Sequence, residues 1–152
     1  MPDLDPNEII TIPAVESDLA ALLAVLSACL AELPPLKPDS AAQLFLRNIR
    51  RDSVLTAKRQ NEIVGICIWS PVLRRLSLLA VLSELRRTGI ASRLLHAVLD
   101  RMPPGDVTVE TFQEDDPRAA AALSLYRKFG FQKDVPLEGY ALPMQKYRLC
   151  RD

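Results

Sequence analysis

A turn rich in hydrogen-bond donors is the first stretch of the chain that could do chemistry. Arg86, Arg87 and Gly89 stand between an apolar run and a stretch whose apolar residues recur at helical spacing. The first N–H groups of a helix have no partner inside the helix, and the helix dipole adds partial positive charge there. Gly89 permits a positive φ or the close approach of a phosphate, and the arginines add charged donors. The pattern predicts an anion site, which we interpret as a pyrophosphate site.

A simpler interpretation of the same turn stays open. The pattern G-x-x-x-x-G-K-[S/T] of a Walker loop and the run G-x-G-x-x-G of a dinucleotide fingerprint are both absent from the sequence. A single glycine has little specificity for phosphate. The alternative is that Gly89 only separates a strand from a helix.

Other kinds of site are disfavoured by the residue counts. His96 is the only histidine, and Cys29, Cys67 and Cys150 are far apart in the sequence. No cysteine pair has the spacing typical of a metal site. With a single histidine, a zinc site or a catalytic triad that depends on histidine is disfavoured. The 19 basic residues equal the 19 acidic residues, whereas nucleic-acid binders usually carry a basic excess. We therefore expect no metal and no nucleic-acid partner.

The start of the chain and its longest apolar stretch bear on location. The segment "MPDLDPNEII" has no basic region followed by an apolar run, so it does not resemble a signal peptide. Residues 19–33 are interrupted by Ser27 and Glu32 and are too few to span a bilayer. A cytoplasmic protein without a membrane partner is the expectation.

Apolar periodicity and turn residues predict the elements that must position the turn. The expected order is strand, helix, helix, three strands, helix, strand, helix, strand. Strands are expected at residues 7–14, 53–58, 62–71, 74–82, 106–112 and 139–149, and helices at 16–33, 38–52, 89–102 and 116–130. The length of 152 residues fits one domain, residues 1–152, with a sizeable core. The sequence thus predicts a mixed α/β domain.

Two stretches together resemble the GNAT superfamily of N-acetyltransferases. The segment "AVLSELRRTGIASRLL" contains the family pattern [Q/R]-x-x-G-x-[G/A], matched by Arg86, Gly89 and Ala91. Further along, "ALSLYRKFGF" contains the run A-x-x-L-Y-x-x-x-G-F, matched by Ala122, Leu125, Tyr126, Gly130 and Phe131. The resemblance is clear over residues 62–149. It implies a GNAT-like acyl-CoA N-acyltransferase fold, a mixed and mostly antiparallel central sheet flanked by helices.

The resemblance also implies acetyl-CoA as cosubstrate and a set of residues that hold it. The pyrophosphate of the coenzyme is expected beside Arg86, on the turn amides of Arg87, Thr88, Gly89, Ile90, Ala91 and Ser92. The pantetheine arm is expected to pair like an extra strand with the backbone of Leu79, Ala80 and Val81. This pairing requires their strand to splay from its neighbour.

Two residues are implied in the chemistry. Tyr126 matches the tyrosine that protonates the departing thiolate in this family. The alternative for Tyr126 is a core aromatic on the apolar face of an alanine-rich helix. Glu110, in "TVETF", is the candidate base, because some GNAT proteins that acetylate protein N-termini carry a glutamate there. The alternative for Glu110 is a side chain that merely faces solvent.

The implied activity is the direct transfer of an acetyl group to a primary amine of a small molecule or a peptide N-terminus, without a metal. Two departures from the family favour an alternative, an acyl-CoA-binding regulatory module with weak or no turnover. Residues 74–82 contain no acidic side chain, and Ala119 stands where members often have an asparagine. A structural subunit without a ligand is a third interpretation. An exposed last strand would also permit a homodimer.

Overall fold

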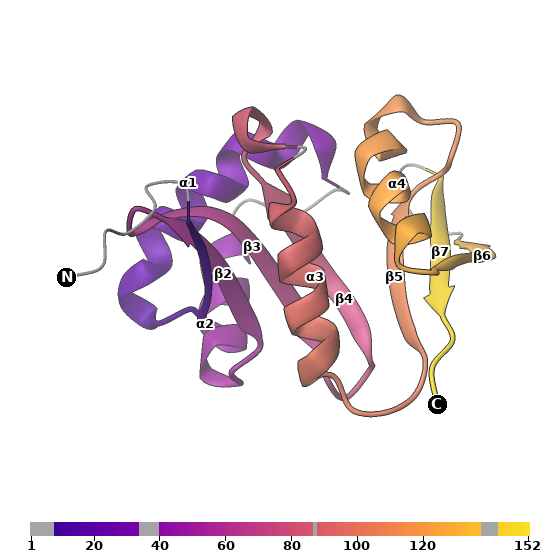
Figure 1. Ribbon diagram of the computed structural model, residues 1–152, viewed down its shortest axis with the longest axis horizontal. Coiled ribbons are helices and arrows are strands. Elements are labelled where there is room, and N and C mark those ends of the chain that lie inside the picture. Colours follow the sequence, from indigo (N-terminus) through magenta and orange to yellow (C-terminus); the bar gives the residue numbers. More distant parts are fainter. Residues whose placement is uncertain (1–7, 34–39, 87, 138–142) are drawn as a thin grey trace.

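The strands form one twisted sheet through the middle of the molecule (Figure 1). The computed structural model describes residues 8–33, 40–86, 88–137 and 143–152. Their strand order is β1-β2-β3-β4-β5-β7-β6. The strands are β1 (Ile9–Pro13), β2 (Val54–Arg59), β3 (Glu62–Ser70), β4 (Arg75–Val81), β5 (Val107–Phe112), β6 (Gln132–Leu137) and β7 (Met144–Leu149). The helices are α1 (Leu19–Cys29), α2 (Ala41–Arg50), α3 (Ile90–Arg101) and α4 (Ala120–Lys128), with 3₁₀ turns η1 (Glu16–Asp18), η2 (Leu30–Glu32), η4 (Ser83–Leu85) and η5 (Pro117–Ala119).

Within the part of the chain that the structure describes, β4 and β5 form the one parallel pair, and the other neighbouring pairs are antiparallel. The mixed, mostly antiparallel sheet that the sequence predicted is therefore confirmed. Among the described residues, the register of β4 with β5 comprises Arg75↔Thr108 and Leu76↔Val109. Beyond these positions the two strands diverge (Figure 1). The sheet thus has a V-shaped opening at its centre.

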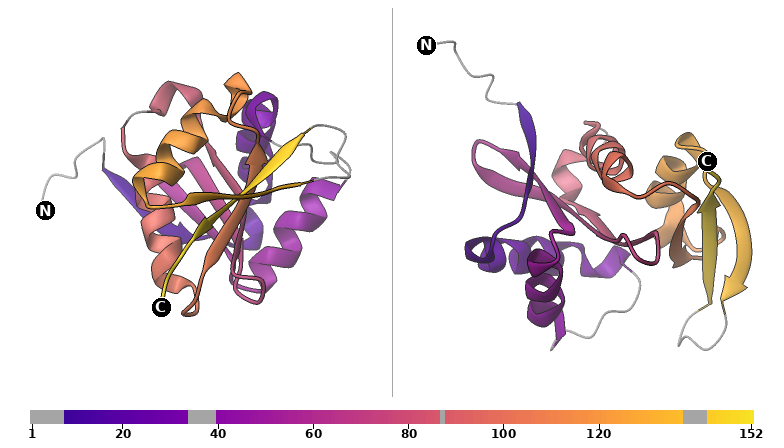
Figure 2. Two further views of the ribbon diagram at one scale, coloured as in Figure 1. Left: turned by 90° about the vertical axis from the view of Figure 1, so that its right-hand side faces the viewer. Right: turned by 90° about the horizontal axis from the view of Figure 1, so that it is seen from below.

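Helices cover both faces of the sheet (Figure 2). On one face, α1 and α2 share a core with β2, β3 and β4 that includes Leu22, Phe45 and Ile66. On the other face, α3 and α4 share a core that includes Leu94 and Leu123. Strand β3 is buried on both sides, which explains its nearly continuous run of apolar residues.

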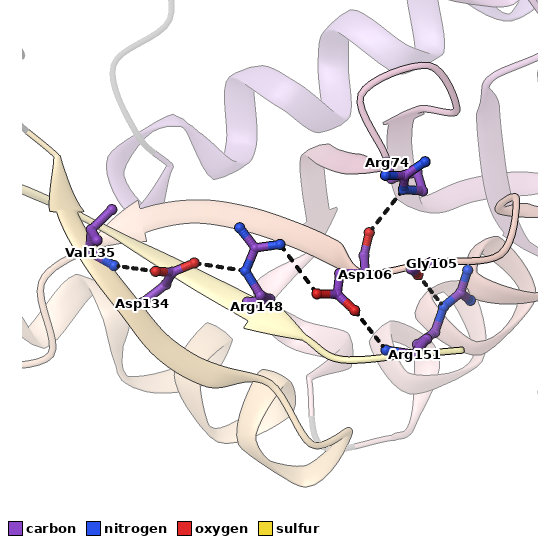
Figure 3. Close-up of polar contacts among 7 residues, drawn as sticks. All are labelled: Arg74, Gly105, Asp106, Asp134, Val135, Arg148 and Arg151. Atoms are coloured by element: carbon purple, nitrogen blue, oxygen red, sulfur yellow. Dashed lines mark hydrogen bonds and ion pairs between the residues drawn. The ribbon is translucent and has the colours of Figure 1, made fainter.

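A polar network joins the strands at the end of the sheet where β4 and β5 still pair (Figure 3). The Asp106 carboxylate accepts hydrogen bonds from the Arg151 N–H at 3.0 Å and from Arg148 Nη1 at 3.4 Å. The Asp106 carbonyl accepts from Arg74 Nε at 3.3 Å. Arg148 Nε also donates to Asp134 Oδ2 at 2.9 Å. These bonds tie β6, β7 and the start of β5 to the β3–β4 turn, beside the positions where β4 and β5 still pair.

Strand β6 is the main difference from the predicted elements, because no strand was expected at residues 132–137. Its sequence, QKDVPL, is largely exposed and contains Pro136, so it lacks the alternation that predicts a strand. Proline is tolerated here because β6 is an edge strand with a register shift between Lys133 and Pro136. Since β7 pairs with both β5 and β6, the expectation of an exposed last strand is wrong.

The predicted helices are present with different limits. The helix expected at 16–33 consists of η1, α1 and η2, and the one expected at 116–130 begins as η5. Part of the helix expected at 38–52 (residues 38 and 39) and the beginning of the last expected strand (residues 139–142) lie outside the described residues. Within the described ranges, no helix combines the length and the apolar character that crossing a membrane requires.

Candidate active site

The turn before α3 has the backbone conformation that its glycine predicted. Gly89 has φ 85° and ψ 8°, a left-handed conformation, and is the N-cap of α3. The Arg93 N–H donates to the Gly89 carbonyl at 3.0 Å, which starts the helical hydrogen bonding. The N–H groups of Ile90, Ala91 and Ser92 precede this bond and therefore have no acceptor inside the helix. The end of α3 thus presents amide donors and the positive end of the helix dipole.

Side chains on both sides of Gly89 brace the turn. The Thr88 hydroxyl donates a hydrogen bond to the Leu85 carbonyl. Arg86 Nη2 donates to the Val81 carbonyl at 3.5 Å, so its guanidinium lies over the end of β4. Arg87, which was also predicted to contribute an amide, lies outside the described residues.

A cavity of about 680 Å³ lies beside the end of β4 and the start of α3. Its walls are β4, the turn before α3, the first turn of α3 and one side of α4, with Cys29 and Leu33 contributed by the α1 region. Most predicted site residues line it: Leu79, Ala80, Val81, Arg86, Gly89, Ile90, Ala91, Ser92 and Tyr126. Thr88 and Glu110 are not among the lining residues.

The backbone of β4 offers hydrogen-bonding groups to this cavity. In an antiparallel ladder, alternate residues direct their N–H and C=O groups to the same neighbour. The Leu82 N–H donates to the Val64 carbonyl of β3, so Ala80 is directed toward β3 as well, while Leu79 and Val81 are directed away from it. The Val81 carbonyl accordingly accepts from Arg86 Nη2 and from Cys29 Sγ, both at 3.5 Å.

Tyr126 lies at the end of α4, where the motif around it has a structural reason. Gly130 has φ 97°, and the Gly130 N–H and Phe131 N–H donate to the carbonyls of Arg127 and Tyr126. This Schellman closure folds the chain back onto the helix. The Phe131 ring consequently packs against the Tyr126 ring, with centroids 5.4 Å apart. The turn at Gly130 therefore places the Phe131 ring against one side of the Tyr126 ring.

Tyr126 is both a core residue and a wall of the cavity. It is 5% exposed and belongs to the core shared with α3, and it also lines the cavity. Burial, and secondarily the negative charge of a nearby Cys67 thiolate, raises the pKa of Tyr126 above its usual value. Burial likewise raises the pKa of the Cys67 thiol to about 12. At neutral pH both groups keep their protons, so Tyr126 is a hydrogen-bond donor.

Glu110 lies just past the point where β4 and β5 separate. It follows Val109, the last β5 residue in register with β4, and its side chain is 26% exposed. Because Val109 packs in the core shared with α3 and α4, alternation places Glu110 on the opposite face of the sheet. Glu110 Oε1 lies 3.7 Å from Arg75 Nη1, and Lys146 is directly across on β7. Glu110 is therefore neither free in solvent nor part of the cavity wall.

Sequence reasoning identified Arg86 but missed two other basic residues of the cavity, Arg118 and Lys128. Arg118 is held in place, because its guanidinium donates to both Asp116 oxygens at 3.0 and 2.6 Å and stacks 4.1 Å above the Phe112 ring. The hydrogen bonds from Arg118 lower the pKa of Asp116. The sequence could have indicated Arg118, because it precedes Tyr126 by about two helical turns and therefore lies on the same face of the helix. Ala119, by contrast, is buried and does not line the cavity.

A comparison with protein-family models finds one match, over residues 50–133, more than half of the 152 residues. The model is described as an acetyltransferase (GNAT) domain. The matched segment contains β4, the turn, α3 and α4, so it includes most of the cavity. No curated protein sequence matches the chain significantly.

Solved structures share the fold over nearly the whole chain at low sequence identity. A GNAT-family acetyltransferase from Bacillus cereus has a TM-score of 0.79 at 17% identity, covering 95% of this chain and 99% of that one. The ribosomal-protein-S18-alanine N-acetyltransferase of Escherichia coli has a TM-score of 0.75 at 18% identity, covering 95% and 94%. YncA of Salmonella typhimurium, solved with its cofactor acetyl-CoA, has a TM-score of 0.73 at 16% identity, covering 96% and 95%. At such identities the likeness concerns the fold.

Proposed function

The chain belongs to the GNAT family of acetyltransferases, and we propose that it transfers an acetyl group from acetyl-CoA to a primary amine. One observation supports this most directly: the outward backbone of β4, the amide end of α3 and Tyr126 all meet in a single cavity. The acceptor in this proposal is a small-molecule amine or a peptide N-terminus. Acetyl-CoA supplies the activated acyl group, and the residues of the chain bind, orient and move protons.

The cavity fits the two chemically distinct parts of this cosubstrate. The amides that follow Gly89, with the helix dipole, suit a pyrophosphate. The backbone of Leu79 and Val81 suits the amide-containing arm, which can hydrogen-bond there as an added strand would. The contacts that the Val81 carbonyl makes at 3.5 Å are long for hydrogen bonds, so an amide donor can replace them at little cost. The volume of about 680 Å³ is typical of ligand pockets.

Tyr126 is proposed as the acid of the reaction. Its raised pKa means that its hydroxyl stays protonated at neutral pH. A protonated phenol in a buried wall can donate a hydrogen bond to the negative charge that develops on a leaving sulfur. The packing of Phe131 against the ring limits how far Tyr126 can turn away from the cavity.

Glu110 is proposed as the base, acting through water. An amine must be neutral before it attacks a thioester, which at pH 7 costs about 4.6 kcal/mol for a lysine and about 1 kcal/mol for an α-amino group. Glu110 lies next to the closed end of the V, on the face away from α3 and α4. The amine would therefore enter from that face of the sheet. The ion pair with Arg75 keeps the carboxylate oriented toward β4.

The proposal is tested by mixing the pure protein with acetyl-CoA and a panel of amines while free thiol is followed. We expect Tyr126→Phe to lower kcat by about a hundredfold, in the range of general acid catalysis, with little change in coenzyme A affinity. Tyr147→Phe is the matched control, because Tyr147 is a buried tyrosine of β7 that does not line the cavity. A Tyr126→Phe variant as fast as the wild type would remove Tyr126 from the mechanism.

The regulatory module remains the second candidate because two sequence features favour it. Residues 74–82 supply no acid beside the cavity, and Ala119 replaces a polar side chain with a buried methyl group. Calorimetric binding of coenzyme A without transfer to any amine would favour this candidate over the enzyme. Absence of binding at millimolar coenzyme A would refute both.

A further inference from the structure

A serine stands at an exposed point in the middle of the sheet. Ser77 belongs to β4, where its neighbours Leu76 and Leu78 are buried and the serine is exposed. Trp69 of β3 pairs with Leu76, whereas Ile68, the residue before Trp69, pairs with Leu78. Among the described residues Ser77 is therefore an extra residue without a partner on β3. Such a bulge bends the strand and redirects a side chain.

The bulge lies where the V begins to open. Among the described residues, Leu76 and Val109 are the last pair between β4 and β5, and Ser77 and Glu110 follow them. Both residues of this pair pack in the core shared with α3 and α4, so alternation directs Ser77 and Glu110 to the opposite face of the sheet. Strands that pair are about 5 Å apart. The two side chains consequently flank one narrow gap, and a small group placed there can contact both.

The two side chains offer this gap different hydrogen-bond acceptors. Glu110 is a carboxylate, with Oε1 3.7 Å from Arg75 Nη1, and it can take up a proton. The Ser77 hydroxyl can accept a hydrogen bond but takes up no proton at neutral pH. Among the described residues it has no hydrogen-bond partner, and it does not line the cavity. The hydroxyl is thus available on the face from which the amine would enter.

We propose that the Ser77 hydroxyl accepts a hydrogen bond from the acceptor amine and thereby selects primary over secondary amines. The inference rests on the proposed function, in which the amine nitrogen bonds to the acetyl carbon, the carbon–sulfur bond breaks and Tyr126 gives its proton to the sulfur. The lone pair of the attacking amine points at the thioester, which leaves a neutral primary amine with two N–H groups. One proton leaves through water to Glu110, and the other stays on the product amide. Ser77 accepts from the N–H that stays, which a secondary amine lacks.

The test measures kcat/KM for pairs of amines that differ by one N-methyl group, on the full chain with saturating acetyl-CoA, by the release of free thiol. We expect the wild type to prefer the primary amine. Ser77→Ala should lower kcat/KM of the primary amine about five- to tenfold, the loss of one hydrogen bond, and leave the secondary amine unchanged. Ser77→Thr keeps the hydroxyl and suits a strand, so it should restore the preference. The matched control is Ser83→Ala, the same substitution at an exposed serine beyond the other end of β4, outside the cavity wall.

The outcomes separate this inference from the function on which it rests. An equal loss for both amines in Ser77→Ala, or no loss for either, would overturn the role of Ser77 and leave acetyl transfer standing. Equal rates of the wild type with the primary and the secondary amine would overturn it too. If the wild type acetylates no amine of the panel, the proposed function fails and the role of Ser77 fails with it. Thermal unfolding of each variant checks that the fold is intact.

Discussion

Gly89→Ala is expected to lose binding out of proportion to its loss of stability. Among the described residues, a Cβ at Gly89 meets no atom within 4 Å, so the new methyl group causes no steric overlap. The cost comes from φ 85°, where an alanine is strained by about 1–2 kcal/mol. The reduced freedom of the unfolded chain offsets about 0.4–1 kcal/mol of this. We therefore expect a loss of about 1 kcal/mol, which lowers Tm by about 2–4 °C for a chain of this size.

The effect on ligand affinity should be larger, because the open space beside Gly89 belongs to the cavity. A methyl group there occupies the position from which an anion would reach the amides. Loss of one charge-assisted hydrogen bond corresponds to about 1.5–3 kcal/mol, or tenfold or more in Kd. Calorimetry with coenzyme A measures this loss, and thermal unfolding measures the stability.

Gly130→Ala is the matched control for Gly89→Ala. Gly130 has a similar φ of 97°, and a Cβ there would lie 3.4 Å from Leu149 Cδ1. Unlike Gly89, Gly130 does not line the cavity. The two variants should lose comparable stability, yet coenzyme A affinity should fall in Gly89→Ala alone. Wild-type affinity in Gly89→Ala, or an equal fall in both variants, would refute the assignment of this turn to the pyrophosphate.

Further outcomes follow from single side chains. Glu110→Gln should slow transfer most for amines of high pKa, and a pH profile of kcat/KM that is unchanged for a lysine acceptor would exclude Glu110 as the base. Tyr147→Phe should raise the free energy of unfolding by about 1 kcal/mol in thermal melts, because among the described residues its buried hydroxyl has no hydrogen-bond partner. Asp134→Asn should lower Tm at pH 7. The hydrogen bond from Arg148 lowers the pKa of Asp134 below its unfolded value. The stability that the Asp134 carboxylate contributes is therefore complete above about pH 4 and is lost as pH falls further. A difference from wild type that does not shrink as pH falls below about 4 would contradict this account.

The local structure of the candidate site could be predicted from the sequence because it depends on few neighbouring residues. A left-handed φ favours glycine, so Gly89 and Gly130 mark the start of α3 and the end of α4 without any knowledge of the fold. The apolar runs at residues 62–71 and 74–82 predicted two strands for a similarly local reason, and β3 and β4 lie there. Strand β6 escaped prediction because an edge strand with a proline satisfies neither the apolar period nor the turn pattern.

The placement of side chains across the site could not be predicted in this way. Lys128 and Arg93 come from different helices, and nothing in their sequence spacing indicates that they line one groove. Cys29 joins the wall beside Val81 although the two are far apart in sequence. Glu110 was assigned to the site or to solvent, whereas the structure gives it an ion pair with Arg75. Such distances depend on how helices pack against the sheet, which many weak contacts determine together.

The sequence by itself determined the turn, the glycine torsions and the strands and helices near the cavity, because backbone torsions and hydrogen bonds between near neighbours are local properties. Only the tertiary structure decided that β4 and β5 separate after Leu76. Their separation leaves one edge of β4 without a neighbouring strand beyond Leu76, while the bond from Arg74 to the Asp106 carbonyl joins the two halves of the sheet beside the positions that still pair. A free edge in the middle of a sheet is a property of the whole arrangement, so no segment of the chain encodes it alone.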